Sequence, residues 1–360
     1  MGAYETFLRP LVFTLEPERA QALAEWGLRR RRLWRFLTWH YDRTDPRLRV
    51  QAAGLDFPSP VGLAAGYDKQ CSVLDSLLAL GFGYVVGGTV LKDPRPGNPK
   101  PRVLRLTRER ALVNALGFPS VGMEAAAASL ERLRGRLSAP GKPALVSVAG
   151  LTQEDFLECH ARLEPLVDGV ELNISSPNTR GLRVFQEPET LARLLAAVNA
   201  QRRKPLFVKL PPSHDPPSHD LFLSLLRVCK AQAVSGLTVA NTRPVEAPAL
   251  AMGRGGLSGP PLLADTLRMV TEARAEVGQG MAINACGGIA TAEDALRALR
   301  AGADTVQLLT ALVYQGPSVA RRINRGLARM LDETGRASLG EMAGRGWGRG
   351  DRNDREADLV

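Results

Sequence analysis

Amide and lysine side chains stand at or just beyond the ends of several short apolar runs. The five are Lys69, Asn114, Asn173, Asn178 and Asn241. An asparagine amide both donates and accepts hydrogen bonds, which suits a planar ligand with alternating carbonyl and N–H groups, and a lysine can hold a carboxylate. Taken singly, each asparagine is better explained as a turn residue that bonds its own backbone. Together, at strand ends of one sheet, they predict a site for a pyrimidine carboxylate.

Two further apolar runs end in Gly287-Gly288 and in Leu309-Thr310, and the segment 255–259 is also rich in glycine. After the last two strands of a parallel barrel, backbone N–H groups and a short helix N-terminus commonly build a phosphate site. Glycine pairs also serve tight turns, so their position after these two runs is the informative feature. It indicates a phosphorylated cofactor such as FMN.

Eight β-rich apolar runs, each followed by a loop and a helical stretch, must position these groups. They are residues 61–64, 84–87, 144–149, 170–174, 206–210, 237–240, 282–285 and 305–308. Continuous apolar runs such as Leu206-Phe207-Val208 fit strands that are buried on both faces. Eight βα units predict an α/β fold, a closed (β/α)8 TIM barrel over residues 46–335, whose reactive groups lie at the C-terminal ends of the strands.

Two connecting segments carry signals of their own. Thr291 and Asp294 form the pattern of a capping box before a helix that Gly302 closes. The segment between the second and third runs is long and holds prolines 94, 96, 99 and 101. Its length and prolines predict a functional loop over the barrel mouth.

Residues 1–45 predict a short helical extension in front of the barrel. Two apolar sets recur at helical spacing: Leu8, Leu11, Val12 and Leu15, then Ala20, Leu23, Ala24 and Leu28. Near them are Trp26, Trp34 and Trp39 with arginines 29–32 and 35, a mixture typical of a membrane interface. The alternative is that both helices simply pack on the main domain. No apolar run approaches the ~18 residues of a spanning helix, so we expect a peripheral protein.

The formal charge of +10 is concentrated in residues 29–35 and 345–355. A basic run could face nucleic acid or anionic lipid. We expect no nucleic-acid partner, because no recognised nucleic-acid module accompanies these arginines. Residues 336–360 are predicted to be a flexible tail. The four cysteines are scattered, without a Cys-x-x-Cys pair or a histidine at zinc-ligand spacing, which predicts a reduced protein without a metal site.

Four segments resemble class 2 dihydroorotate dehydrogenases, and the resemblance extends over nearly the whole chain. They are residues 60–69 (PVGLAAGYDK), 96–102 (PGNPKPR), 173–179 (NISSPNT) and 255–259 (GGLSG). The third is highly specific, and residues 15–20 (LEPERA) resemble the helical extension that forms the quinone entrance of that class. The resemblance implies FMN-dependent oxidation of dihydroorotate to orotate in pyrimidine biosynthesis, with a membrane quinone as electron acceptor. We also expect a monomer that binds peripherally to an anionic lipid surface through arginines 29–32, at the cytoplasmic side of the cell membrane.

The resemblance further implies roles for individual residues. Ser176 matches the base that takes the C5 proton while the C6 hydride passes to flavin N5, and Thr179 with a bound water relays the proton. Soluble class 1 enzymes have cysteine in place of Ser176. Residues that match substrate contacts are Lys69, Asn114, Ala115, Leu116, Gly117, Phe118, Asn173, Asn178, Asn241 and Thr242. Residues that match flavin contacts are Ala65, Gly66, Lys69, Thr89, Ser147, Asn173, Lys209, Ala240, Gly259, Gly287, Gly288, Leu309 and Thr310.

The chain departs from the family pattern at four places. Ser147 lies in a third strand that looks more like class 1, Ala240 replaces a threonine, Leu309 a tyrosine and Gln21 a histidine. No histidine is near Ser176 in the sequence. Two alternatives therefore stay open: a flavin enzyme of the same fold with fumarate or a soluble carrier as acceptor, and a flavin-binding protein without catalysis.

Overall fold

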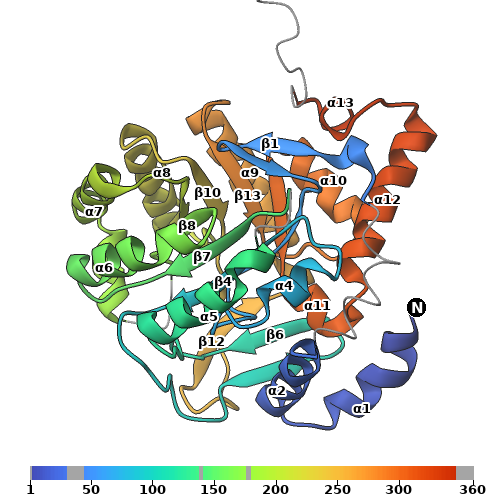
Figure 1. Ribbon diagram of the computed structural model, residues 1–360, viewed down its shortest axis with the longest axis horizontal. Coiled ribbons are helices and arrows are strands. Elements are labelled where there is room, and N and C mark those ends of the chain that lie inside the picture. The colour runs from blue at the N-terminus through green and yellow to red at the C-terminus, as the bar shows by residue number, and fades with distance from the viewer. Residues whose placement is uncertain (1, 31–43, 138–140, 176–179, 346–360) are drawn as a thin grey trace, which may run out of the picture.

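The computed structural model describes residues 2–30, 44–137, 141–175 and 180–345 (Figure 1). Eight parallel strands close into a barrel. In spatial order they are β10 (Gly236–Val239), β13 (Ala282–Cys286), β14 (Thr305–Leu308), β3 (Val61–Leu63), β4 (Tyr84–Val90), β7 (Ala144–Val148), β8 (Gly169–Asn173) and β9 (Leu206–Lys209). Each predicted run supplies one strand, and every strand residue except the half-buried Cys286 is buried. The predicted (β/α)8 barrel is confirmed.

Helices cover the outside of this barrel. The main ones are α4 (Leu74–Leu78), α5 (Met123–Leu137), α6 (Gln153–Leu163), α7 (Pro188–Gln201), α8 (Pro216–Ala231), α9 (Leu263–Val277), α10 (Ala292–Arg300) and α12 (Val319–Thr334). Helix α10 begins with the predicted capping box, in which Thr291 and Asp294 bond each other's backbone N–H groups. Gly302 follows its end with a φ of +120°, a conformation that glycine adopts without strain.

Short elements connect or precede these helices. They are the 3-10 segments η2 (Pro46–Leu48), η3 (Glu164–Leu166), η4 (Arg180–Gln186) and η5 (Pro260–Leu262), the hairpin β1 (Val50–Ala52) and β2 (Leu55–Phe57), and α11 (Thr310–Gln315). The hairpin is a separate two-stranded antiparallel sheet. These elements leave the eight-stranded barrel intact.

The expected loop after the second barrel strand contains strands of its own. It forms β5 (Val103–Leu106) and β6 (Ala111–Asn114), which join β11 (Arg243–Glu246) and β12 (Arg254–Ser258) in a four-stranded sheet. The sheet has a small apolar cluster, made of Ala111, Val113, Ala115, Ala247, Leu250 and Leu257. Two segments that are distant in the sequence therefore meet beside the barrel mouth. The prolines and the length of the loop did not predict this sheet.

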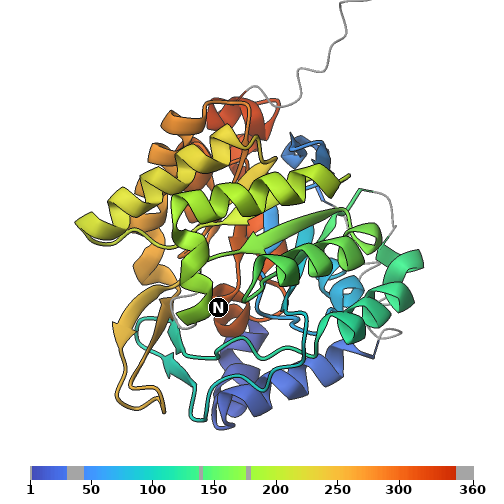
Figure 2. The same ribbon diagram turned by 90° about the vertical axis from the view of Figure 1, so that its left-hand side faces the viewer.

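The N-terminal segment is helical, as η1 (Tyr4–Leu8), α1 (Arg9–Phe13) and α2 (Pro17–Leu28). Both ribbon views place α2 beside the four-stranded sheet (Figures 1 and 2), where it contacts β5, and η1 contacts α11. Arg102 donates to the carboxylate of Glu18, and Arg105 donates to the carbonyl of Leu15. The extension is thus attached to the four-stranded sheet by charged hydrogen bonds. No helix of the described residues is long and apolar enough to cross a bilayer.

The described part of the expected C-terminal tail contains a short helix, α13 (Leu339–Ala343). Its Leu339 and Met342 are buried, and Arg345 beyond it forms an ion pair with the buried Asp304. This part of the predicted flexible tail is helical because two apolar side chains in the polar segment pack against α10 and α12. Residues 346–360 lie outside the described part.

Candidate active site

A cavity of about 530 Å³ opens where the barrel strands end. This volume falls within the roughly 300–1,000 Å³ of small-molecule sites. Loops after the strands line one part of it, and residues of η1, α1 and α2 line another. One continuous space therefore joins the barrel mouth to the N-terminal helices.

The polar residues predicted to hold a substrate meet in this cavity. Lining it are Lys69, Asn114, Leu116, Gly117, Phe118, Asn173, Asn241 and Thr242. Burial lowers the pKa of Lys69, and the nearby carboxylates of Glu25 and Glu18 oppose that shift. Amide groups and a lysine that gains from an anionic partner are the groups that a planar carboxylate ligand needs.

A chain of hydrogen bonds fixes the amides at the strand ends. Asn241 donates to the hydroxyl of Ser175, Ser175 donates to Asn173, and Asn173 donates to Thr89, each over 2.9 Å. The Thr89 hydroxyl lies 3.1 Å from that of Ser147. Sequence reasoning missed Ser175, which is buried and lies in the middle of this series of hydrogen bonds. Its one signal was its position beside Ser176 directly after a strand.

The family resemblance assigns the base to Ser176, a substrate contact to Asn178 and the proton relay to Thr179, and all three lie outside the described residues. Their neighbours on both sides are described. Ser175 belongs to the hydrogen-bond chain at the cavity, and η4 begins at Arg180. The roles of these three residues stay predictions.

Most of the predicted flavin contacts also line the cavity. They are Ala65, Gly66, Lys69, Thr89, Asn173, Lys209, Ala240, Gly259, Gly287, Gly288, Leu309 and Thr310. One predicted flavin contact, Ser147, and one predicted substrate contact, Ala115, lie behind its wall. Ser147 is fully buried and reaches the cavity only through the hydroxyl of Thr89, and Ala115 packs in the small apolar cluster of the four-stranded sheet.

The described residues fit a planar, phosphorylated cofactor. Gln307 is 1% exposed and lines the cavity, yet neither its amide oxygen nor its nitrogen has a hydrogen-bond partner in the described part of the chain. A buried amide in that state costs about 1–3 kcal/mol, which a polar ligand edge would relieve. A Cβ on Gly288 would stand 2.4 Å from the backbone nitrogen of Leu263, so only glycine leaves this wall open. The paired hydroxyls of Ser258 and Thr310, 2.8 Å apart, add polar groups beside it.

The opposite end of the cavity is mainly apolar. Leu8, Val12, Phe13 and Ala24 line it. Arg105 lines it as well, with its guanidinium carbon 4.4 Å from the centre of the Phe13 ring. Sequence reasoning did not single out Arg105, because an arginine in a polar loop has no distinguishing pattern. An apolar passage with one cation suits a ligand that carries a polar head and a hydrocarbon body.

Three of the four departures from the family pattern line this cavity, namely Gln21, Ala240 and Leu309. Leu309 lines the cavity next to Thr310. Gln21 donates to the backbone carbonyl of Tyr67 and to Glu25, each over 2.9 Å. The amide of Gln21 thereby links α2 to the loop that carries Lys69.

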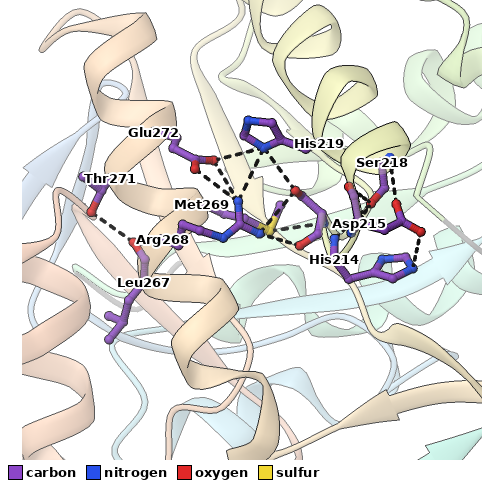
Figure 3. Close-up of polar contacts among 10 residues, drawn as sticks. His214, Asp215, Ser218, His219, Leu267, Arg268, Met269, Thr271 and Glu272 are labelled. Carbon is purple, nitrogen blue, oxygen red and sulfur yellow. Dashed lines mark hydrogen bonds and ion pairs between the residues drawn. The ribbon is translucent and has the colours of Figure 1, made fainter.

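None of the histidines that the structure describes lines this cavity. His160 is buried beside Glu164, and His214 and His219 lie at the start of α8 (Figure 3). His219 has Ser213 and Glu272 near it, but both approach its Nδ1 atom, at 3.4 and 3.6 Å. A serine nucleophile and its orienting acid must contact opposite ring nitrogens. The cluster is therefore not arranged as a hydrolytic triad.

Comparisons with known proteins agree with this arrangement. The family model described as dihydroorotate dehydrogenase matches residues 47–331. A dihydroorotate dehydrogenase (quinone) of Erythrobacter litoralis is 38% identical over 94% of this chain and 98% of its own length, and one of Thermus thermophilus is 41% identical over 83% and 87%. The solved structure of DHODH in complex with ferulenol from Eimeria tenella has a TM-score of 0.80 at 30% identity, over 92% of this chain and 98% of that one. The chain therefore belongs to the dihydroorotate dehydrogenase family of oxidoreductases, and the two bacterial relatives named here carry the name dihydroorotate dehydrogenase (quinone).

Proposed function

We propose that this protein binds FMN in the barrel mouth and oxidises dihydroorotate to orotate for pyrimidine biosynthesis, with a membrane quinone as acceptor. The observation that carries the proposal is the single cavity that joins an amide- and lysine-lined pocket to an apolar passage between the N-terminal helices. FMN held by these residues would supply a two-electron acceptor for the substrate hydride and an electron donor for the quinone.

The described residues would bind and orient the substrate. Lys69 is the cation for the carboxylate of the substrate, and the amides of Asn114, Asn173 and Asn241 match its carbonyl and N–H groups. Because Ser175 links Asn173 to Asn241, both amides are oriented before a ligand arrives. Orientation in advance lowers the cost of reaching a reactive geometry.

We assign Ser176 as the base that takes the C5 proton, with Thr179 in the relay. A hydroxyl is a weak base, so its activation must come from neighbouring groups that orient it and stabilise charge. The hydrogen-bond chain that passes through Ser175, one residue before, supports this location. The proposed partners are dihydroorotate and quinone, and the proposed form is a monomer.

The N-terminal extension, residues 1–45, is proposed to be the route of the quinone and the membrane contact. Phe7, Leu8, Leu11, Leu23 and Trp26 are 51–70% exposed on its helices. Such apolar exposure next to basic side chains favours peripheral binding to an anionic lipid surface. The corresponding location is the cytoplasmic side of the cell membrane.

Anaerobic spectroscopy tests the proposal. The purified protein should carry FMN, dihydroorotate should bleach its visible absorption, and a soluble quinone analogue should restore it. Ser176→Ala should retain FMN and lose most of the bleaching rate near neutral pH. Bound flavin that stays oxidised with dihydroorotate would instead favour a protein without catalysis. Reoxidation by fumarate but not by quinone would favour the alternative acceptor.

A further inference from the structure

The segment 96–102 (PGNPKPR), which the structure describes in full, belongs to the family resemblance but does not line the cavity. Its contacts reach two groups of residues that do. On one side is the segment 114–117, which contributes Asn114, Leu116 and Gly117 to the cavity wall, and on the other is α2 of the apolar passage. Arg102, which ends the segment, makes contacts toward both sides.

The guanidinium of Arg102 divides its donors between these two sides. Its Nη1 group donates to the backbone carbonyls of Pro96 and Asn98, over 2.7 and 2.9 Å. Its Nη2 and Nε groups donate to the carboxylate of Glu18, over 2.8 and 3.1 Å. The arginine side chain is only 10% exposed. A lysine at this position would have a single donor nitrogen in place of the planar fork, so it could not reach both sets of acceptors.

Asn98 continues the first of these contacts to the substrate segment. Its backbone N–H donates to the carbonyl of Leu116, and its side-chain amide donates to the carbonyl of Ala115, each over 2.9 Å. Gly117 has a φ of +68° and lies so close to the Asn98 amide that a Cβ would stand 2.4 Å from it. The N–H of Ala115 donates to the backbone carbonyl of Arg102 over 2.9 Å. The loop 96–98 therefore supports the cavity wall that holds the predicted substrate contacts.

We propose that Arg102 is a positioning residue for both halves of the reaction. Its one guanidinium holds the substrate wall through Pro96 and Asn98, and it holds the quinone-side helix α2 through Glu18. The inference rests on the proposed function. The two sides share no acceptor, so either contact can be removed while the other remains, but loss of the planar, charged fork loosens both ends of the cavity at once.

Three variants of the FMN-loaded protein test this division. Binding of orotate is measured by calorimetry, and attachment of α2 by hydrogen exchange of its backbone amides. In Arg102→Lys, the Kd for orotate and the exchange rate of α2 should both rise about tenfold or more, because charged hydrogen bonds are lost on both sides. Glu18→Gln should accelerate the exchange of α2 and leave the Kd for orotate unchanged. Asn98→Ala should raise the Kd for orotate and leave the exchange of α2 unchanged.

A general loosening of the fold would move both measurements in all three variants, so this pattern separates positioning from stability. Arg108→Lys, at an exposed arginine on the turn between β5 and β6, is the matched control and should leave both measurements unchanged. An orotate Kd or an α2 exchange rate that stays at the wild-type value in Arg102→Lys would overturn the shared role.

If Arg102→Lys does not fold, the other two variants decide. An orotate Kd that rises in Glu18→Gln, or that stays at the wild-type value in Asn98→Ala, refutes the inference, and the expected separation supports it. A wild-type protein that takes up no FMN or binds no orotate would instead refute the proposed function.

Discussion

One bidentate ion pair contributes to the attachment of α2 and can be removed by a single substitution. Glu18 accepts the Nη2 group of Arg102 over 2.8 Å and its Nε group over 3.1 Å. The two side chains are only 20% and 10% exposed. We therefore expect more than the ~0.2–1 kcal/mol of an exposed pair and less than the ~3–5 kcal/mol lost when a fully buried pair is broken. Hydrogen bonds to charged groups of this kind contribute about 1.5–3 kcal/mol.

Glu18→Gln should therefore raise the population in which α2 is detached by roughly 10- to 100-fold, since 1.4 kcal/mol is a factor of ten. Hydrogen exchange of the backbone amides in α2 should accelerate by that factor, while the amides of β8 and β9 stay protected. The KM for quinone should rise, because α2 forms part of the apolar passage. Anaerobic bleaching by dihydroorotate should not change.

The same pair predicts a pH dependence. Burial disfavours the charge of Glu18, but hydrogen bonds and charge from Arg102 outweigh it and hold its pKa below the ordinary value. A lowered folded-state pKa means that the attachment is complete above the ordinary carboxyl range and is lost as pH falls through the lowered value. Glu109→Gln, an exposed carboxylate on the turn between β5 and β6, is the control. Unchanged α2 exchange in Glu18→Gln would refute this account of how the extension is held.

Three further predictions concern the substrate site, the fold and the membrane surface. Lys69→Met should raise the KM for dihydroorotate by about 10- to 100-fold in steady-state assays, because one charged hydrogen bond is lost. An unchanged KM would show that Lys69 does not bind the substrate. Asp304→Asn should lower the free energy of unfolding in urea by about 3–5 kcal/mol, because its buried carboxylate pairs with Arg274 and Arg345. A loss below about 1 kcal/mol would contradict this role of the carboxylate. Leu11→Asp should weaken binding to anionic vesicles by about tenfold or more in sedimentation, because the side chain at this position, 68% exposed in the wild type, would no longer enter the lipid. Equal binding of the variant and the wild type would place the membrane contact elsewhere.

The barrel could be predicted from the sequence because its signal is local. Each strand is a short apolar run between polar turns, as 206–208 shows, and a parallel strand covered on both faces requires that pattern. The capping box of α10 is local too, since Thr291 and Asp294 are three residues apart. The four-stranded sheet was not predictable in this way, because β6 pairs with β12 more than a hundred residues later in the chain.

The motif residues around the cavity were identified by type and position, but their contacts were decided by the tertiary structure. The sequence by itself assigned Asn173 and Asn241 to strand ends, whereas only the folded barrel brings Ser175 between them. The family resemblance assigned Ser147 to the flavin, whereas the barrel directs that hydroxyl to Thr89. Arg105 had no signal, since it is an ordinary charged residue until the fold places it beside the cavity. Sequence patterns predict the local backbone conformation and which face of an element is buried. Contacts between side chains of distant strands form only when the barrel closes.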